Sequence, residues 1–229
     1  EDSVLNKIAY WTHVRGASRE IFDDATRTDI HTFDEGWIWY IPLANDVVSI
    51  GAVLDTQKIK PWTEKAPQER FDRALASVTK IADWAAKGEQ VEQVQVVSNI
   101  SYRNERFSGD GVVLIGDASM FIDPVFSAGV TIAIRSAKLA AESINAALDA
   151  GDVSMARFQD YEDRIKQPMQ NVFKLIHNWY KILERADSIN IFLKSQSYPL
   201  LRERLVVLLS GGYEKADMDA ILAEAEVPS

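Results

Sequence analysis

GVVLIGDASMFIDPVFSAG, residues 111–129, carries the strongest structural signal in the chain. Residues 112–115 are a short apolar run rich in β-branched side chains, which predicts a strand buried on both faces. Gly116 comes next, and glycine permits the tight backbone turn that such a strand needs where it ends. Residues 127–129 then lead into a long segment, 130–148, for which we predict a helix. The local order is therefore a strand, a Gly-Asp turn, a loop and a helix.

This order of elements favours a binding site for a dinucleotide or a flavin. Asp117 is expected at the carboxyl end of the strand, the edge of an open α/β sheet where ligands collect. A carboxylate there accepts hydrogen bonds from sugar or ribityl hydroxyls, although a plain turn carboxylate is the alternative. The unpaired N–H groups that begin the helix near Gly129 attract anions.

Two motifs resemble a known family. The form GDASMFIDPVFSAG resembles the second FAD-contacting motif of flavin-dependent monooxygenases and is most similar to the halogenase branch. GWIWYIP resembles the W-x-W-x-I-P signature of flavin-dependent halogenases at Trp37, Trp39, Ile41 and Pro42. The two motifs occur in the expected order, which indicates the tryptophan-halogenase-like branch of the FAD-dependent monooxygenase superfamily.

The resemblance implies an α/β fold of the monooxygenase type, which binds FAD or NAD(P). The glycine-rich G-x-G-x-x-G turn that opens such folds is absent from the sequence. We therefore expect a C-terminal portion that lacks the N-terminal β-α-β unit and is completed by an N-terminal FAD-binding segment or chain. Three parts are predicted: an antiparallel substrate domain with one crossing helix (1–100), the second FAD-contacting segment (101–150) and a helical region (151–229).

Alternating β-branched and aromatic residues in the first hundred positions predict an antiparallel sheet. The predicted strands, at 8–14, 28–33, 37–42 and 47–53, follow one another closely and suggest a meander. Helical spacing of apolar residues predicts one helix over 66–87, and a further strand is expected at 91–97.

Side chains two positions apart point to the same face of a strand. Trp37, Trp39 and Ile41 are therefore expected on one surface, with Ile38 and Tyr40 on the other. A packed aromatic core is one explanation of this pattern. The resemblance implies another, in which Trp37 and Trp39 separate the flavin from the organic substrate and leave halide as the nucleophile.

The resemblance also implies cofactors and partners. A separate flavin reductase supplies reduced FAD, which with O2 oxidises chloride or bromide to hypohalous acid. The substrate is an electron-rich phenol, pyrrole, indole or carrier-tethered aromatic. The implied cofactor-binding residues are Gly116, Asp117, Asp123, Pro124, Gly129 and Val130, and the implied halide-binding residues are Ser127, Ala128 and Gly129.

Asp123 and Pro124 allow two interpretations. Pro124 gives the loop a rigid backbone beside the flavin ring. Asp123 either orients that ring or caps the loop, and a purely structural role is equally open.

After residue 152 apolar side chains repeat at intervals of three and four, which predicts one long helix with an apolar stripe. The stripe consists of Phe158, Tyr161, Ile165, Met169, Val172, Ile176, Trp179 and Leu183. Pro168 lies inside it and is expected to kink or split the helix. The stripe is explained as core, or as a cap over the substrate in which Phe173, Trp179 and Tyr180 are aromatic contacts.

Composition narrows the functional classes. A net charge of −9, from 25 basic and 34 acidic residues, disfavours a nucleic-acid surface. The sequence contains no apolar run long enough to predict a membrane span. The absence of cysteine excludes disulfides, thiolate metal sites and a cysteinyl flavin bond within this sequence and favours the cytoplasm. Three histidines lie without metal-ligand spacing.

Three functions are compatible with the sequence. The first is part of an FAD-dependent halogenase. The second is a related FAD-dependent monooxygenase or reductase in which the tryptophan motif serves packing. The third is a non-catalytic fragment that needs a partner FAD-binding chain.

Overall fold

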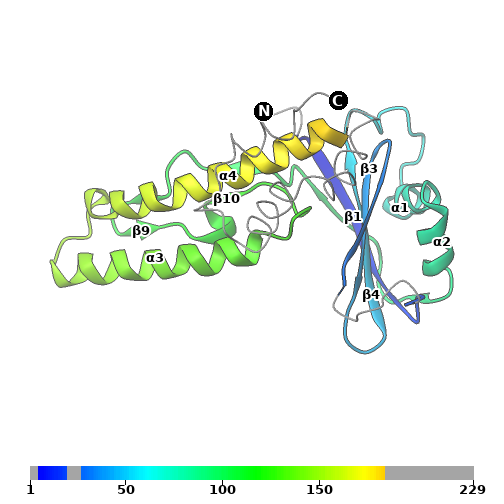
Figure 1. The fold of residues 1–229 in the computed structure, drawn as a ribbon, viewed down its shortest axis with the longest axis horizontal. Helices are drawn as coiled ribbons and strands as arrows, with labels where there is room; N and C mark the ends of the chain where they lie inside the picture. The colour runs from blue at the N-terminus through cyan, green and yellow to red at the C-terminus, as the bar shows by residue number, and fades with distance from the viewer. Residues whose placement is uncertain (1–4, 20–26, 184–229) are drawn as a thin grey trace, which may run out of the picture. The chain divides into compact units, whose positions relative to one another are not determined.

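The computed structural model describes residues 5–19 and 27–183 (Figure 1). The chain divides into two compact units, with the division between Ile100 and Ser101. The first unit holds the tryptophan motif, and the second holds the Gly-Asp turn.

The first unit is built on one antiparallel sheet of six strands. The strands are β1 (Lys7–Arg15), β2 (Asp29–Phe33), β3 (Gly36–Pro42), β4 (Val47–Asp55), β5 (Glu89–Gln90) and β6 (Gln95–Ser98). Their order is β2-β3-β4-β1-β5, and β6 also pairs with β1. The first four strands lie where the alternating pattern predicts them.

The strand order differs from a four-strand meander. β2, β3 and β4 do follow one another, but β1 pairs with β4, from Lys7 opposite Asp55 to Arg15 opposite Val47. Both strands have nine residues, so this pairing satisfies more backbone groups than the five-residue β2 would allow. The ammonium of Lys7 lies 2.6 Å from the Asp55 carboxylate at the end of the ladder.

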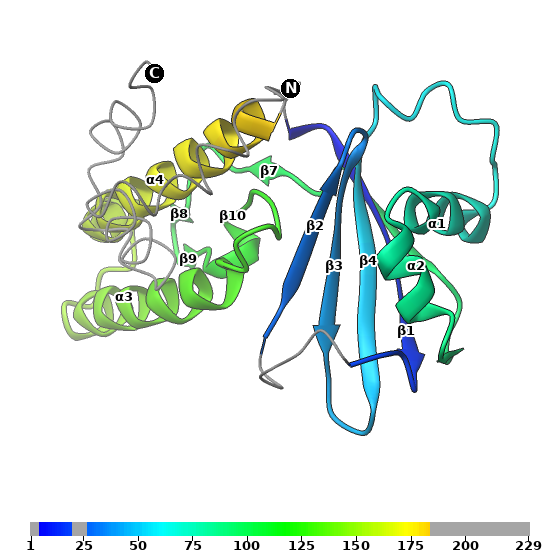
Figure 2. The same ribbon diagram turned by 45° about the vertical axis from the view of Figure 1, so that its right-hand side comes forward.

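Two helices, α1 (Pro67–Ala76) and α2 (Thr79–Ala85), cover one face of the sheet (Figure 2). A single crossing helix was expected, but Val78 adopts φ −125° and ψ 81° and ends the helical run. The break allows Ile81 and Trp84 to join the core between helices and sheet. Of the strand expected at 91–97, only residues 95–97 lie in a strand, as part of β6, which pairs with β1.

The second unit contains two long helices that lie side by side, with short strands between them (Figures 1 and 2). Helix α3 (Gly129–Asp149) confirms the helix predicted over 130–148. The other elements are β7 (Tyr102–Arg103), β8 (Ser108–Gly109), β9 (Val112–Val113), the 3-10 turn η2 (Gly116–Ala118), β10 (Met120–Phe121), the 3-10 turn η3 (Met155–Phe158) and α4 (Gln159–Leu183).

The buried strand predicted at 112–115 is not formed. Only Val112 and Val113 are in a strand, which pairs with β8, and the exposed fractions of Val112 and Ile115 are 54% and 41%. Every strand pair in the described part of the chain is antiparallel. An apolar strand is buried on both faces only within a covered sheet, and these residues supply no such neighbours.

Helix α4 carries the predicted stripe as buried core. Its buried members are Phe158, which immediately precedes the helix, and Tyr161, Ile165, Met169, Val172 and Ile176. The helix continues through Pro168, so of the two expected effects, a kink or a split, the split does not occur. Proline removes one helical hydrogen bond, and burial of the stripe outweighs that loss. The side chains of Trp179 and Leu183, and all of residues 184–229, lie outside the described residues.

Glu162 joins α4 to the segment that precedes the Gly-Asp turn. Its Oε1 accepts hydrogen bonds from the backbone N–H of Phe107 (2.9 Å) and from the N–H and hydroxyl of Ser108 (both 2.8 Å). Its Oε2 lies 2.6 Å from the Lys166 ammonium. Burial pushes the pKa of Glu162 up, but these hydrogen bonds outweigh it and lower the pKa to about 2. The carboxylate is therefore ionised at neutral pH.

Candidate functional site

The Gly-Asp turn is a single 3-10 turn held from inside. Gly116 has φ +51°, a conformation that glycine adopts without strain, which confirms the tight turn expected there. Its carbonyl accepts hydrogen bonds from the Ser119 N–H (3.0 Å) and hydroxyl (2.6 Å). Its N–H donates to the Ser136 hydroxyl of α3 at 2.8 Å.

Close packing against α3 fixes the position of this turn. A Cβ atom on Gly116 would lie 3.0 Å from the Cβ of Ala133. Ser136 is fully buried, so its bond to Gly116 is shielded from water. Any larger residue at position 116 therefore pushes the turn away from the helix.

Asp117 is exposed and lies beside the first residue of α3. Its Oδ1 is 3.8 Å from the point where a Cβ on Gly129 would stand. The Tyr102 hydroxyl donates to the Asp117 carbonyl at 2.5 Å, and the Asn104 amide donates to the Ala118 carbonyl at 2.8 Å. The structure thus brings together two residues predicted to share a site, Asp117 and Gly129.

The start of α3 presents unpaired N–H groups. Ala128 is the N-cap residue, and no side chain caps the helix. Helix geometry leaves the N–H groups of Gly129, Val130 and Thr131 without acceptors inside the helix, at the positive end of its dipole. The Ser127 N–H is already used, since it donates to the Pro124 carbonyl at 2.9 Å. None of the hydrogen bonds described for residues 5–19 and 27–183 uses the N–H of Ala128 or Gly129, the other two predicted halide residues, and Ala128 is itself buried, with an exposed fraction of 4%.

Asp123 is buried, with an exposed fraction of 5%. Its Oδ1 accepts a hydrogen bond from the Val125 N–H (2.9 Å), and its Oδ2 accepts one from the Tyr180 hydroxyl (2.8 Å). Of the two predicted interpretations, the geometry supports the loop cap. Tyr180, predicted as a substrate contact, is buried and directs its hydroxyl to Asp123.

The side chains of the tryptophan motif alternate between the two faces of the sheet, as predicted. Ile38 and Tyr40 are fully buried in the core beneath α1 and α2. Trp37 and Trp39 lie outside that core, with ring centroids 5.9 Å apart, and Trp37 is 2% exposed. The Trp39 indole N–H donates to the Ser49 hydroxyl at 3.1 Å.

Gly51 makes room for the Trp39 ring. It lies opposite Trp39 on β4, and a Cβ at Gly51 would approach the indole to 2.1 Å. Trp11 lies opposite Gly51 on β1 and therefore shares the face. Sequence reasoning did not single out Trp11, although its place in the alternating run of β1 was a signal.

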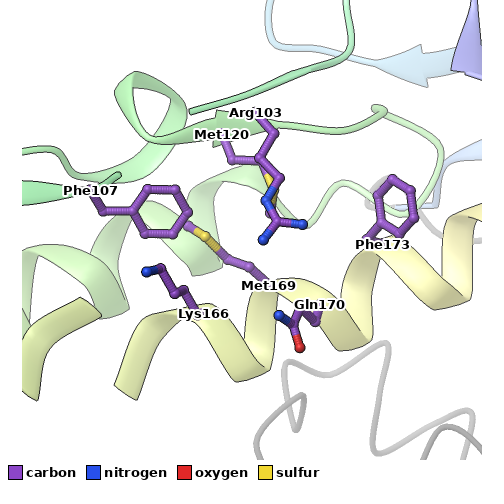
Figure 3. A pocket seen from close by; sticks show the side chains of 7 residues that line it. All are labelled: Arg103, Phe107, Met120, Lys166, Met169, Gln170 and Phe173. Atoms are coloured by element: carbon purple, nitrogen blue, oxygen red, sulfur yellow. The ribbon is translucent and has the colours of Figure 1, made fainter. Parts of the chain in front are cut away.

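Phe173 borders a shallow depression between α4 and the segment that precedes the Gly-Asp turn (Figure 3). Figure 3 shows the Arg103 side chain directed toward α4. The lining residues are Arg103, Phe107, Met120, Lys166, Met169, Gln170 and Phe173. Lys166 is held by Glu162, and the Phe173 ring stacks on His177 at 5.8 Å.

Within residues 5–19 and 27–183, no group of three or more His, Asp or Glu side chains gathers closely enough to hold a metal ion. The same part of the chain contains no helix with the length and apolar character needed to cross a membrane.

Comparison with known proteins agrees with this geometry. Residues 12–196 match the sequence model of a family described as tryptophan halogenase. The chain is 31% identical over 209 residues to the 1H-pyrrole-2-carbonyl-[peptidyl-carrier protein] brominase of Pseudoalteromonas luteoviolacea, covering 90% of this chain and 49% of that protein. It is 32% identical over 146 residues to the corresponding chlorinase of Pseudomonas fluorescens, covering 64% of this chain and 32% of that protein.

Among solved structures, the flavin-dependent brominase Bmp2 superposes with a TM-score of 0.81 at 29% identity, covering 98% of this chain and 56% of that one. Halogenase PltM, solved with phloroglucinol and FAD, has a TM-score of 0.76 at 20% identity, covering 99% of this chain and 49% of that one, a likeness of fold alone. The chain spans about a third to a half of the length of the curated relatives named here.

Proposed function

Because this chain belongs to the tryptophan halogenase family, we propose that it is the part of a flavin-dependent halogenase that holds the second FAD contact, the halide and the substrate-side sheet. One observation carries the proposal: Asp117 lies beside the uncapped start of α3, so a hydroxyl acceptor and anion-attracting N–H groups share one surface. Both groups fit a ligand that combines polyol and anionic parts, as FAD does.

Each predicted residue then has a role toward FAD. Asp117 accepts hydrogen bonds from hydroxyls of the ribityl or pyrophosphate region. The N–H groups of Gly129 and Val130 face the polar edge of the flavin ring, and Pro124 stiffens the loop beside it. Gly116 keeps the turn against α3. When bound and reduced, FAD supplies the activation of O2 that oxidises halide.

The halide site is proposed at the N–H groups of Ala128 and Gly129. A helix start attracts an anion without a charged side chain. The Ser127 N–H is committed to the Pro124 carbonyl, so Ser127 contributes conformation and its hydroxyl. In a dry site such fixed dipoles act more strongly than they do in water.

Trp37 and Trp39 are proposed to separate FAD from the organic substrate. Support comes from their departure from the helix-covered core and from the absence of a side chain at Gly51, which lets the Trp39 indole lie on the sheet. If Trp37 and Trp39 served only aromatic packing, they would not need to lie on the face opposite the core. A wall of this kind blocks direct oxygen transfer to the substrate and leaves oxidised halide to react.

The substrate proposed is an electron-rich aromatic, with a carrier-tethered pyrrole as the first candidate. Two relatives are named for acting on a pyrrole-carbonyl group attached to a peptidyl carrier protein. Phe173 and Trp179 are proposed as aromatic contacts on α4. A separate flavin reductase is the proposed source of reduced FAD.

A further FAD-binding segment is proposed to complete the enzyme. The relatives are two to three times as long as the part that this chain matches. Helix α3 also leaves apolar side chains uncovered, with exposed fractions of 72% for Val130, 67% for Ile134 and 62% for Leu148. Such surface is costly in water and is normally covered by another segment.

The test compares two proteins: the chain alone, and the chain fused to the part of the Pseudoalteromonas luteoviolacea brominase that it does not match. Each receives FAD, a flavin reductase with its reductant, O2 and a panel of pyrrole, phenol and indole substrates, with or without bromide. We expect the fusion to bind FAD and to form brominated product, seen by mass spectrometry as the bromine isotope doublet.

A second test uses the Asp117→Ala variant of the fusion. Loss of hydrogen bonds to a charged acceptor should raise the FAD dissociation constant by about tenfold or more. Oxygenated product formed without halide would support the monooxygenase alternative instead. If neither protein bound FAD, the result would favour the third alternative, a non-catalytic fragment.

A further inference from the structure

A buried carboxylate fastens the loop between β10 and α3 to α4. The two oxygens of the Asp123 carboxylate have different partners, the Val125 N–H at 2.9 Å and the Tyr180 hydroxyl at 2.8 Å. Both Asp123 and Tyr180 are more than nine-tenths buried. The carboxylate therefore joins the loop to a helix 57 positions further along the chain.

The loop needs such a fastening. Ser127 has φ +51°, which non-glycine residues adopt infrequently, and its N–H closes a turn onto Pro124. No side chain caps the helix that begins next. A strained residue persists only where surrounding contacts fix it, and the Asp123–Tyr180 hydrogen bond is a buried side-chain contact that ties this loop to α4.

We propose that Asp123 and Tyr180 are positioning residues for halide, because their hydrogen bond holds residues 123–129 in the conformation that directs the Ala128 and Gly129 N–H groups at the anion. The inference rests on the proposed halide site. It predicts that loss of the hydrogen bond weakens halide binding while affinity for the aromatic substrate is retained.

The first variant is Tyr180→Phe, which removes only the hydroxyl. Its matched control is Tyr161→Phe, which removes a buried hydroxyl of the same helix that donates to the Leu114 carbonyl at 2.5 Å. A second variant, Asp123→Asn, keeps an acceptor for Val125 and should fall between wild type and Tyr180→Phe.

Three quantities are measured in the FAD-loaded fusion: amide hydrogen exchange of residues 123–130, broadening of the chloride-35 NMR signal, and steady-state KM values for bromide and for the aromatic substrate. Loss of a hydrogen bond to a charged group corresponds to about tenfold. In Tyr180→Phe we expect about tenfold faster exchange, tenfold weaker chloride binding and a tenfold higher KM for bromide. The KM for the aromatic substrate should stay within twofold, and Tyr161→Phe should match wild type in all three quantities.

Unchanged exchange in Tyr180→Phe would overturn the inference, and so would faster exchange with unchanged chloride binding. A wild-type fusion that binds FAD but broadens no chloride signal would identify the halide site itself as wrong, and the inference would fall with it. If the wild type binds chloride and Tyr180→Phe binds it equally well, the inference alone fails.

Discussion

At Glu162 one buried carboxylate serves four donors. Three come from Phe107 and Ser108 and one from Lys166, so the side chain joins α4 to the strand segment that leads toward the Gly-Asp turn. The three hydrogen bonds from Phe107 and Ser108 are buried, so loss of the carboxylate leaves buried donors unpaired, which makes this residue a strong determinant of stability.

Glu162→Gln should lower the free energy of unfolding at pH 7 by about 2 kcal/mol, because the charged acceptor is lost from a buried network. The folded pKa of Glu162, about 2, lies below its ordinary 4.5. The stabilisation is therefore complete above pH 4.5 and is lost as the pH falls toward 2.

Urea unfolding at pH 7 and at pH 3 checks this expectation, and the difference between variant and wild type should shrink at the lower pH. The matched control is Asp163→Asn, at an exposed carboxylate on the same helix. A constant difference at both pH values would contradict the assigned role.

The sequence predicted that Asp117 and Gly129 share a site, and the structure brings the two residues together. Their contact with a ligand stays a prediction. Asp117 and Gly129 are recognisable because turn chemistry and helix starts have local signatures. Glu162, Ser136 and Tyr102 had no such signature, since each acts through a partner far away in the sequence. Their roles follow only from tertiary contacts.

At the scale of elements, the contact between η2 and α3 fixes the position of the Gly-Asp turn in the candidate site. The buried Ser136 hydroxyl accepts a hydrogen bond from the Gly116 N–H and itself donates one to the Ala133 carbonyl at 3.0 Å. A short turn with few contacts of its own thereby takes its position from a helix of 21 residues.

Ser136→Ala should destabilise the protein by about 1–3 kcal/mol, because it leaves a buried N–H of the turn without an acceptor. Thermal unfolding measures the loss, and Ser143→Ala on the same helix is the control. FAD affinity of the fusion should fall as well, since Asp117 follows directly after the displaced residue. Equal stability of the two variants would show that water or another group replaces the hydroxyl.

Periodicity predicted the elements better than their arrangement. The apolar spacing of α3 and α4 and the alternation of β1 to β4 were local patterns and gave correct elements. The pairing of β1 with β4 and the interruption at Val78 depend on strand length and on core packing. The strand expected at 112–115 failed because its pattern describes a covered environment that the described residues do not supply.

At the scale of the whole molecule, the exposed apolar side chains of α3 are the feature that bears on association with other polypeptides. Val130, Ile134 and Leu148 recur at helical spacing, and all three are more than half exposed. An apolar stripe of this kind favours association with another polypeptide surface.

Ile134→Lys combined with Leu148→Lys should reduce binding of an apolar fluorescent dye to the isolated chain by severalfold. The free energy of unfolding should change by about 0.5 kcal/mol or less, as for exposed positions generally. In the fusion the same pair of changes should weaken FAD retention, because the stripe is the proposed contact with the FAD-binding segment. Asn145→Lys, which removes no apolar surface, is the control, and equal dye binding by all three proteins would contradict the interpretation.

The bare backbone at Gly51 also constrains the order in which this surface can change over generations. With Trp39 in place, a methyl group at position 51 displaces the indole and costs its bond to Ser49. The two positions are therefore coupled, and we expect a side chain at 51 to be tolerated better once a smaller residue stands at 39.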